Sequence, residues 1–308
     1  MIVDAHVHVF PRVDSFTGSG ELKSLKFGKV KKGTGEVFRL LPPTFGETCF
    51  TPETLVEYLD WVGVDRAVIL QGGLYGFYNE YVADAVSKWP ERLVGCALVD
   101  PMTQHATGVL RYAIEELGLR ALKFECSEAY GLSGLHPKMQ IDAPEWKNIF
   151  QEAKKYHLPL IFDPGPPGTI GYQVKGLKKL VESHPELDVV ICHLGLPHPG
   201  LENSEDHYNA WKGMIALGEN PNVWIDIASL PALFGDHEYP YPEAQRYLKM
   251  VYETLGSTRL LWGSDIPGIL NQITYRQCLD LVKRNCNFLS PEEKKNILGE
   301  NAKKLFKL

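Results

Sequence analysis

The sequence has no apolar run long enough to cross a membrane and no excess of positive charge. Asp4, His6 and His8 interrupt the apolar stretch at the N-terminus, so it does not match the core of a secretory signal peptide. Lysine and arginine total 32 against 38 aspartates and glutamates, which gives a net charge of -6. Sequence-independent binding to nucleic acid requires clustered positive charge. We therefore expect a cytoplasmic protein that binds neither membranes nor nucleic acid.

The sequence also lacks paired cysteine motifs and a dinucleotide-binding fingerprint. Its 6 cysteines are scattered without a C-x-x-C pair, and several lie in apolar runs typical of strands. In a chain of 308 residues this distribution indicates reduced thiols rather than a disulfide framework. No G-x-G-x-x-G follows the first apolar run, and no linker-like stretch divides the chain, which disfavours two doubly wound domains.

A short apolar run followed by a helical pattern recurs along the chain. The runs predict strands over residues 1–10, 66–72, 92–100, 119–125, 158–165, 187–195, 222–229 and 259–265. The helical patterns cover residues 51–63, 78–90, 105–118, 144–157, 171–185, 204–220, 242–256 and 272–285. With a final helix over residues 290–306, this order predicts an α/β protein with one domain, residues 1–308, folded as a TIM (β/α)8 barrel.

Residues 11–50 interrupt the regular alternation of strands and helices. This segment is rich in Gly, Pro and Lys, and it separates the first strand from its helix by far more than an ordinary connection. Long loops of this kind are typically lids over a site, so we interpret it as a lid. Its basic run, residues 22–35, suits either attraction of an anionic substrate or, as we favour, a solvated face of a flexible hairpin.

Polar residues follow most of the predicted strands, where the active site of a TIM barrel is built. These residues are His6, His8, Lys123, Glu125, Asp163, His193, Asp226 and Asp265. His6 and His8 are two apart, so on an extended strand both side chains point to the same face. Neutral imidazole nitrogens bind divalent metals, and the position of the pair at the first strand end favours a metal site.

The remaining strand-end groups have candidate roles in catalysis. Asp265, in "LLWGSDIPG", is able to bind a metal and to take a proton from metal-bound water. His193 follows a strongly apolar strand, so it either has a hydrogen-bond partner in the core or serves the site, and we favour the site. Lys123 suits binding of a substrate carboxylate or pairing with Glu125 or Asp163. The role of Asp226 stays open between the site and a structural contact.

Loop residues on the catalytic side extend the candidate list. His198 and His237 lie in or near the loops after the sixth and seventh strands, and we name both as candidates for substrate binding. Phe77, Tyr78 and Phe234 suit either a pocket wall or a subunit interface, so the sequence leaves both a homo-oligomer and a monomer open.

Four motifs together resemble the amidohydrolase superfamily. They are "DAHVHVF" at the first strand, "CHLG" at the sixth, "GSDIP" at the eighth and the terminal "ILGENAKKLF". The chain is most similar to the amidohydrolase-related branch, which includes aminocarboxymuconate semialdehyde decarboxylase and related hydrolases. The resemblance covers nearly the whole chain through the order of its strands. It implies a TIM barrel with one catalytic divalent metal, zinc first and manganese as the alternative.

Carried over by position, the resemblance gives roles to individual residues. His6 and His8 correspond to the first-strand ligands, Asp265 to the last-strand ligand and proton acceptor, and His193 to the sixth-strand histidine that orients or activates water or substrate. One departure is that Asp163 stands where the family usually has a fifth-strand histidine. Asp163 is either a metal ligand, the role we assign, or a substrate contact.

A further position leaves the family pattern open. Lys123 stands where some members of the superfamily carry a carboxylated lysine, and we favour an unmodified lysine in its place.

The expected reaction is hydrolysis of a small, carboxylate-bearing lactone, ester or amide by metal-activated water. Non-oxidative decarboxylation of an unsaturated or aromatic acid is the alternative, because the same groups support it. We place hydrolysis first, since the first-strand motif lacks the glutamate that the aromatic-acid decarboxylases of the family often carry. A metal-free barrel that binds a small molecule is a third hypothesis, which the departure at Asp163 keeps open.

Overall fold

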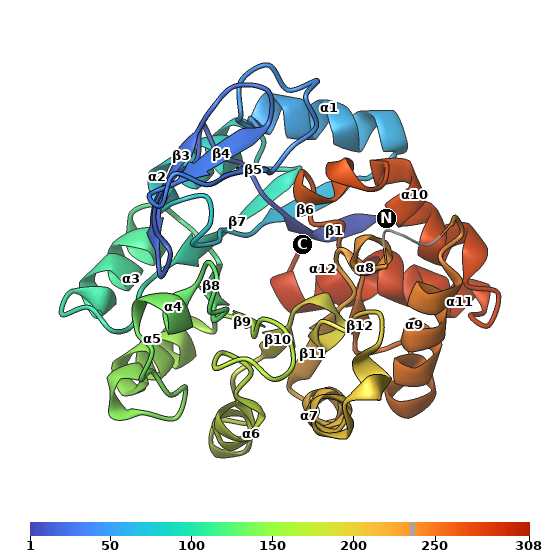
Figure 1. The fold of residues 1–308 in the computed structure, drawn as a ribbon. Coiled ribbons are helices and arrows are strands. Elements are labelled where there is room, and N and C mark those ends of the chain that lie inside the picture. The colour runs from blue at the N-terminus through green and yellow to red at the C-terminus, as the bar shows by residue number, and fades with distance from the viewer. Residues whose placement is uncertain (235–237) are drawn as a thin grey trace.

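The computed structural model describes residues 1–234 and 238–308 and contains a parallel barrel with helices around it (Figure 1). Its 8-stranded sheet runs in the order β1-β6-β7-β8-β9-β10-β11-β12. The strands are β1 (Val3–Val7), β6 (Arg66–Ile69), β7 (Leu93–Leu98), β8 (Ala121–Glu125), β9 (Leu160–Asp163), β10 (Val189–Ile191), β11 (Val223–Asp226) and β12 (Leu260–Leu261). Each lies within a predicted strand, and the predicted TIM barrel is confirmed.

The first and last strands meet at a seam that closes the barrel. The N–H of Ala5 donates to the carbonyl of Trp262 at 3.0 Å, and the N–H of His8 donates to the carbonyl of Ile266 at 2.9 Å. Val7 and Ile266 also form a parallel bridge. The ends of β1 and β12 are therefore held side by side, which matters because His6, His8 and Asp265 lie on the two sides of this seam.

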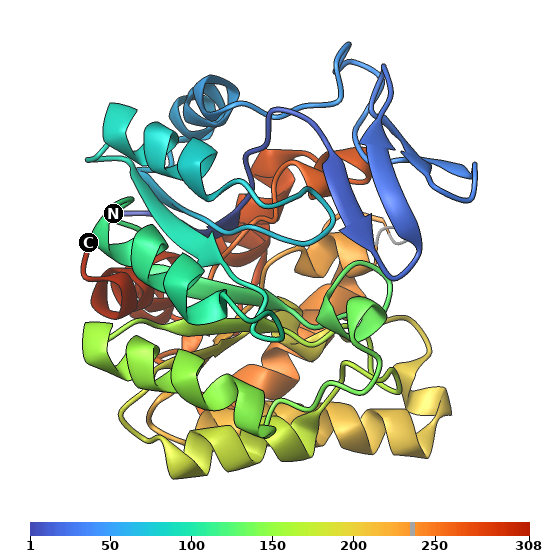
Figure 2. The ribbon, with the colours of Figure 1, turned by 90° about the vertical axis from the view of Figure 1, so that its left-hand side faces the viewer.

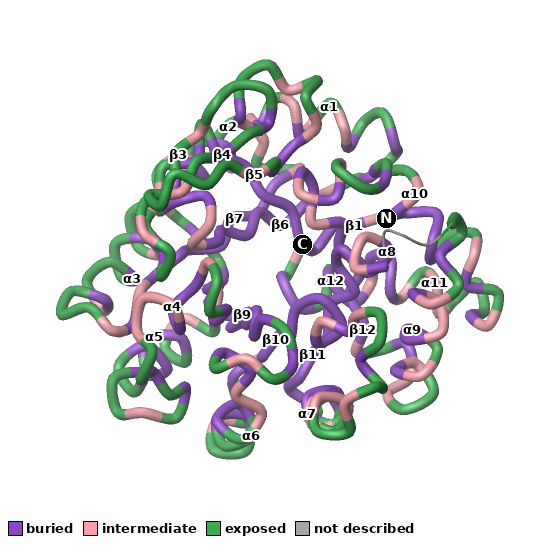
Figure 3. Tube along the Cα trace, viewed as in Figure 1, coloured by how far each residue is buried: buried purple, intermediate pink, exposed green. Residues whose placement is uncertain are grey.

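Helices cover the outside of the barrel, and the exposed residues gather on their outer faces (Figure 3). The helices that follow the barrel strands are α1 (Pro52–Val62), α2 (Asn79–Lys88), α3 (Ala106–Glu115), α5 (Lys147–Tyr156), α6 (Val174–Ser183), α7 (Glu205–Ala216), α9 (Pro242–Leu255) and α10 (Tyr275–Asp280). Helix α1 has the end signals that the sequence pattern predicts. The Thr51 hydroxyl caps its N-terminus, Pro52 occupies its first turn, and Gly63 ends it with a φ of 81°.

Four further short α-helices are present among the described residues. They are α4 (Leu132–Leu135) and α8 (Leu230–Leu233) in loops, and α11 (Pro291–Lys295) and α12 (Asn301–Phe306) near the C-terminus. A π-helical segment joins α11 to α12, so the predicted final helix is present with one widened turn. Leu305 and Phe306 of α12 pack with side chains inside the barrel and close its N-terminal end. The site must therefore open at the other end.

Residues 11–50 form a small antiparallel sheet rather than a loop. Its strands are β2 (Asp14–Thr17), β3 (Gly20–Ser24), β4 (Lys29–Lys32) and β5 (Val37–Arg39). Leu22 of β3 and Val30 of β4 are fully buried, while the lysines between them in sequence are exposed, as expected for a sheet with one buried face. In Figure 2 this sheet lies at the end of the barrel opposite the two termini, which is the C-terminal end of the strands.

The basic side chains of this small sheet are largely engaged on the outside. Lys23 lies 2.7 Å from Glu21, Lys32 lies 2.9 Å from Glu36, and Lys26 of the connecting turn lies 3.6 Å from Glu47. The choice between attraction of an anionic substrate and a solvated basic face stays a prediction.

The structure also bears on the cysteines and on the hydropathy of the helices. All 6 cysteines are free, as expected, and all but Cys49 are buried. Among the helices of residues 1–234 and 238–308, none is long and apolar enough to cross a membrane.

Candidate active site

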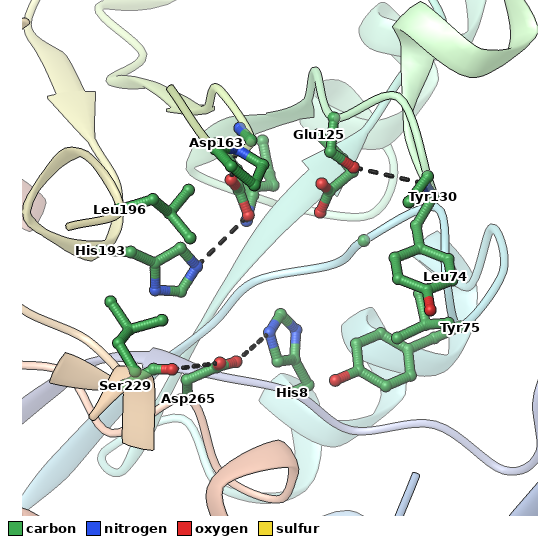
Figure 4. A pocket seen from close by; sticks show the side chains of 17 residues that line it. His8, Leu74, Tyr75, Glu125, Tyr130, Asp163, His193, Leu196, Ser229 and Asp265 are labelled. Atoms are coloured by element: carbon green, nitrogen blue, oxygen red, sulfur yellow. Dashed lines mark hydrogen bonds and ion pairs between the residues drawn. The ribbon is translucent and has the colours of Figure 1, made fainter. Parts of the chain in front are cut away.

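A cavity of about 340 Å³ opens at the C-terminal ends of the barrel strands (Figure 4). Its polar lining combines predicted strand-end groups with residues of the loops, namely His8, Tyr75, Lys123, Glu125, Ser127, Tyr130, Asp163, His193, Ser229 and Asp265. Residues from distant parts of the sequence meet here because the strands carrying them are parallel neighbours in one barrel.

His6 of β1 and His8, which directly follows β1, each use Nδ1 for a protein contact. His6 Nδ1 is 2.9 Å from Asp226 Oδ2, and His8 Nδ1 is 2.9 Å from the carbonyl oxygen of Leu70. In each contact the oxygen faces Nδ1 of the ring, so Nε2 is the ring nitrogen that faces the site. The Nε2 atom of His6 is buried and has no hydrogen-bond partner among the described residues. Such an atom is what an absent metal would leave behind.

Asp265 completes a group that fits a divalent metal. Its Oδ1 lies 3.0 Å from His8 Nε2 and 3.9 Å from His6 Nε2. One ligand atom from each of these three residues lies within 4.8 Å of the others. Two imidazole nitrogens and one carboxylate oxygen are a donor set that suits zinc or manganese. His6, His8 and Asp265 would hold the metal.

Asp265 is also held firmly by its neighbours. Its N–H donates to the carbonyl of His6 at 2.8 Å, and Ser229 Oγ donates to its Oδ2 at 3.0 Å. Burial alone would raise the pKa of Asp265, but the hydrogen bond from His8 and the nearby His193 hold it well below its ordinary value. The φ angles of Asp265, Ser229 and His193 are 65°, 59° and 58°, a conformation that is uncommon outside glycine and clusters at functional sites.

Asp226 lies behind the site and joins two of its elements. Its Oδ2 accepts from His6, while its Oδ1 accepts from the backbone N–H groups of His193 at 2.7 Å and Ala228 at 3.0 Å. Burial would raise the pKa of Asp226, but His6 lowers it to about 2, so the carboxylate is ionised. The structure thus answers the question that the sequence left open: Asp226 is fully buried and positions His6 and the start of the loop that carries His193.

His193, Asp163 and Lys123 form a second group across the cavity. His193 Nε2 is 3.3 Å from Asp163 Oδ2, and its Nδ1 is 3.1 Å from the carbonyl oxygen of Ala228. Lys123 Nζ is 3.7 Å from the same oxygen of Asp163. Burial alone would lower the pKa of His193, but the Asp163 carboxylate raises it to about 10. The histidine therefore carries a proton at neutral pH.

The position of Asp163 bears on its predicted metal role. Among the described residues, the groups of three ligand atoms within 4.8 Å are His6 with His8 and Asp265, and His6 with Cys192 and His193. Neither includes Asp163. In the second group, burial raises the pKa of the Cys192 thiol well above its ordinary value, which disfavours the thiolate that binds metals. Asp163 as a ligand stays a prediction.

The two loop histidines have different outcomes. His198 does not line the cavity, and its Nδ1 lies 3.0 Å from the carbonyl oxygen of Pro199. His237 lies outside the described residues. The role of each in substrate binding stays a prediction.

Sequence reasoning did not identify four polar residues of the cavity lining, which are Tyr75, Ser127, Tyr130 and Ser229. Tyr75 stacks on Phe10 with ring centroids 4.4 Å apart and lies 4.7 Å from the His8 ring. Ser229 holds Asp265. A signal existed for two of them: Tyr75 is in the glycine-rich stretch after the second barrel strand, and Ser229 is the last residue of the strand predicted over residues 222–229.

Comparisons with known proteins identify the family of this chain. The amidohydrolase family model matches residues 3–308. A curated relative, L-fucono-1,5-lactonase of Burkholderia ambifaria, is 30% identical over 129 residues, which are 39% of this chain and 41% of the relative. The chain therefore matches less than half of the length of that relative.

Solved structures share the fold over the full chain. A probable 2-pyrone-4,6-dicarboxylic acid hydrolase from Acinetobacter baumannii, with citric acid bound, has a TM-score of 0.69 at 22% identity and covers 100% of this chain and 99% of its own. A zinc-bound amidohydrolase from Burkholderia multivorans has a TM-score of 0.70 at 14% identity, with the same coverage. At these identities the likeness shows the fold alone. Since the family model matches nearly every residue, the chain belongs to the amidohydrolase family.

Proposed function

We propose that the chain is a metal-dependent hydrolase that opens a small lactone, ester or amide, with lactones as the first choice. The observation that carries the proposal is the buried Nε2 atom of His6, which lacks a partner and faces Asp265 Oδ1 beside His8. Zinc or manganese bound by these three residues would polarise the substrate carbonyl and acidify a water molecule at the site. The partial likeness to a lactonase supports the choice of lactones.

The residues of the chain supply the remaining chemistry. Asp265 is ionised, so its carboxylate is able to accept a proton from the attacking water. Ser229 and the backbone hold Asp265 in one orientation, which lowers the entropy that must be lost before reaction. His193 lies across the cavity with its two ring nitrogens facing Asp163 and the carbonyl of Ala228, so its positive charge would act on the carbonyl oxygen of the substrate without a direct hydrogen bond.

The charge of the pocket bears on the substrate. Lys123 is the one lysine or arginine among the described residues that line the cavity, and its ammonium faces Asp163. Glu125 lines the same wall. The lysines of the small sheet do not line it. The cavity thus offers little free positive charge from lysine or arginine, which favours neutral or singly charged substrates over dicarboxylates.

Decarboxylation of an unsaturated or aromatic acid is the alternative reaction, and a metal-free binding barrel is the third. The complete set of His6, His8 and Asp265 disfavours the metal-free binding barrel. Without a metal, burial of His6 Nε2 with no hydrogen-bond partner would cost free energy that nothing offsets. Between hydrolysis and decarboxylation, the lactonase relative favours hydrolysis.

Elemental analysis with a lactone assay tests the proposal. We expect about one zinc or manganese per chain in the wild type, and loss of metal with at least a ~100-fold fall in lactone hydrolysis in His6→Ala/His8→Ala. Asp265→Asn should abolish hydrolysis.

The matched control His105→Ala/His184→Ala replaces two histidines that do not line the cavity, and it should retain both the metal and the activity. Equal activity of the wild type and the His6→Ala/His8→Ala variant would rule out the metal mechanism, and release of CO2 from unsaturated acids without lactone turnover would favour decarboxylation.

A further inference from the structure

A second cavity of about 500 Å³ adjoins the active-site cavity. The two share Ser127, Ala129 and Pro166 in their linings, so they are neighbouring compartments that meet along one wall. The second compartment is lined by Gly18, Ser19, Ser127, Glu128, Ala129, Ser133, Gly134, Pro137, Pro166, Thr169 and Ile170. None of these residues belongs to the metal site.

Three segments distant in sequence form its walls. They are the turn between β2 and β3 of the small sheet, the loop after β8 with α4, and the loop after β9. Glycines allow the first two to meet: a Cβ on Gly18 would lie 2.6 Å from the backbone of Gly134, which is closer than such atoms approach. The small sheet therefore contacts α4 directly and forms one side of the second compartment, which is open to solvent.

The chemistry of the second compartment differs from that of the first. Four hydroxyl side chains line it, those of Ser19, Ser127, Ser133 and Thr169. Its described lining contains no lysine, arginine or histidine, and its one charged residue is Glu128. Ser133 is 1% exposed, and its hydroxyl has no hydrogen-bond partner among the described residues. A buried hydroxyl without a partner is rare in folded proteins and points to a group that is absent.

We propose that the second compartment binds the uncharged, hydroxyl-bearing end of an extended lactone whose carbonyl lies in the first compartment. This inference rests on the proposed function for the reaction, and it adds the class of substrate. Hydroxyl groups of a polyol chain donate and accept hydrogen bonds, as the serine and threonine side chains do. A carboxylate at the same end would be repelled by Glu128, and the described lining has no lysine, arginine or histidine to pair with it.

Three lactones separate the features of this proposal. Gluconic acid γ-lactone has a hydroxylated tail, glucaric acid γ-lactone has the same ring with a carboxylate at the tail, and γ-butyrolactone has no tail. We expect the wild type to have a kcat/KM for the gluconic lactone at least ~10-fold above that for the glucaric lactone, because leaving a charge without a partner weakens binding by more than 1.4 kcal/mol.

Thr169→Leu fills the second compartment and has a matched control in Thr103→Leu. Each threonine hydroxyl donates to the carbonyl three residues earlier, Thr169 to Pro166 and Thr103 to Asp100, but Thr103 lines neither compartment. We expect Thr169→Leu to lower the ratio of kcat/KM for the gluconic lactone to that for γ-butyrolactone about 10-fold, the effect of losing roughly 1.4 kcal/mol of binding. Thr103→Leu should keep the wild-type ratio.

A binding measurement keeps the two proposals distinguishable. Calorimetric titration of the gluconic lactone into Asp265→Asn and into Asp265→Asn/Thr169→Leu measures the second compartment without turnover. If no lactone is hydrolysed but Thr169→Leu weakens binding, the proposed function fails and the binding site stands. If Thr169→Leu leaves the ratio and the binding unchanged, or if the glucaric lactone is preferred, the assignment of the second compartment is wrong.

Discussion

Asp226 joins His6 of the proposed metal site to the backbone of His193. Its carboxylate holds His6 through Nδ1 and the backbone of His193 at once, although it does not line the cavity itself. A carboxylate that accepts from a metal-binding histidine fixes its tautomer and orientation, and removal of such a partner commonly lowers metal affinity 10- to 100-fold.

The prediction for Asp226→Asn follows from the tautomer of His6. The asparagine Oδ1 is still able to accept from the backbone of His193, but its NH2 group would face His6 Nδ1 and favour the proton on Nε2. We expect about a 10- to 100-fold loss of zinc affinity, measured by competition with a chelator. Asp188→Asn is the control, since Asp188 accepts from the Trp224 indole away from the cavity. Unchanged affinity in Asp226→Asn would show that His6 does not bind the metal.

The candidate site was readable from the sequence where local rules determine it. The two-residue spacing of His6 and His8 places both side chains on one face of β1, and Asp265 follows the last barrel strand by direct count. Pairing of Lys123 with Asp163 was among the alternatives that the sequence offered. The contacts of Asp163 with His193 and of Asp226 with His6 were not predictable, because a 3.3 Å or 2.9 Å contact depends on how side chains of different strands pack. No local pattern in the sequence records those distances.

At the scale of elements, the small sheet was harder to predict than the barrel. The barrel strands are buried on both faces and appear as apolar runs, whereas β3 and β4 alternate single apolar residues with lysines over four or five positions. The basic composition of residues 22–35 obscured this alternation. Leu22 and Val30, both fully buried, are the residues that carried the strand signal.

The contact between Gly18 and Gly134 holds the small sheet on α4, and it supports an element-scale prediction. Gly18→Ala places a methyl group 2.6 Å from the backbone of Gly134, so the sheet must shift away from α4. We expect a loss of about 1–3 kcal/mol in local stability, seen as faster hydrogen exchange in residues 14–39. Gly46→Ala, in the same insertion, meets no atom within 4 Å and is the control. Equal exchange rates in the two variants would contradict a fixed contact at Gly18.

At the scale of the whole molecule, the proposed metal joins the two ends of the barrel sheet. His6 and His8 lie on β1 or directly after it, and Asp265 follows β12, so ligands come from both sides of the seam. Backbone bonds and the contact of Ser264 N–H with Asp4 Oδ1 at 2.9 Å already close this seam. A metal would add a further link between residues that are about 260 positions apart in sequence.

Removal of the metal should therefore lower the stability of the entire barrel. A ligand that binds the folded state alone adds about 2.7 kcal/mol when its free concentration is 100 times its Kd. For a chain of 308 residues, with an unfolding entropy of about 2.1 cal/mol/K per residue, that corresponds to a fall in Tm of roughly 4 °C on chelation. Calorimetric scans of the wild type with and without chelator measure this shift, and His8→Ala/Asp265→Asn should show none because it lacks two of the three ligands. A similar fall in the Tm of that variant would mean that the chelator acts elsewhere. A fall in the wild type without a fall in the variant would locate the metal at the seam, and it would tie the closure of the barrel to the site of catalysis.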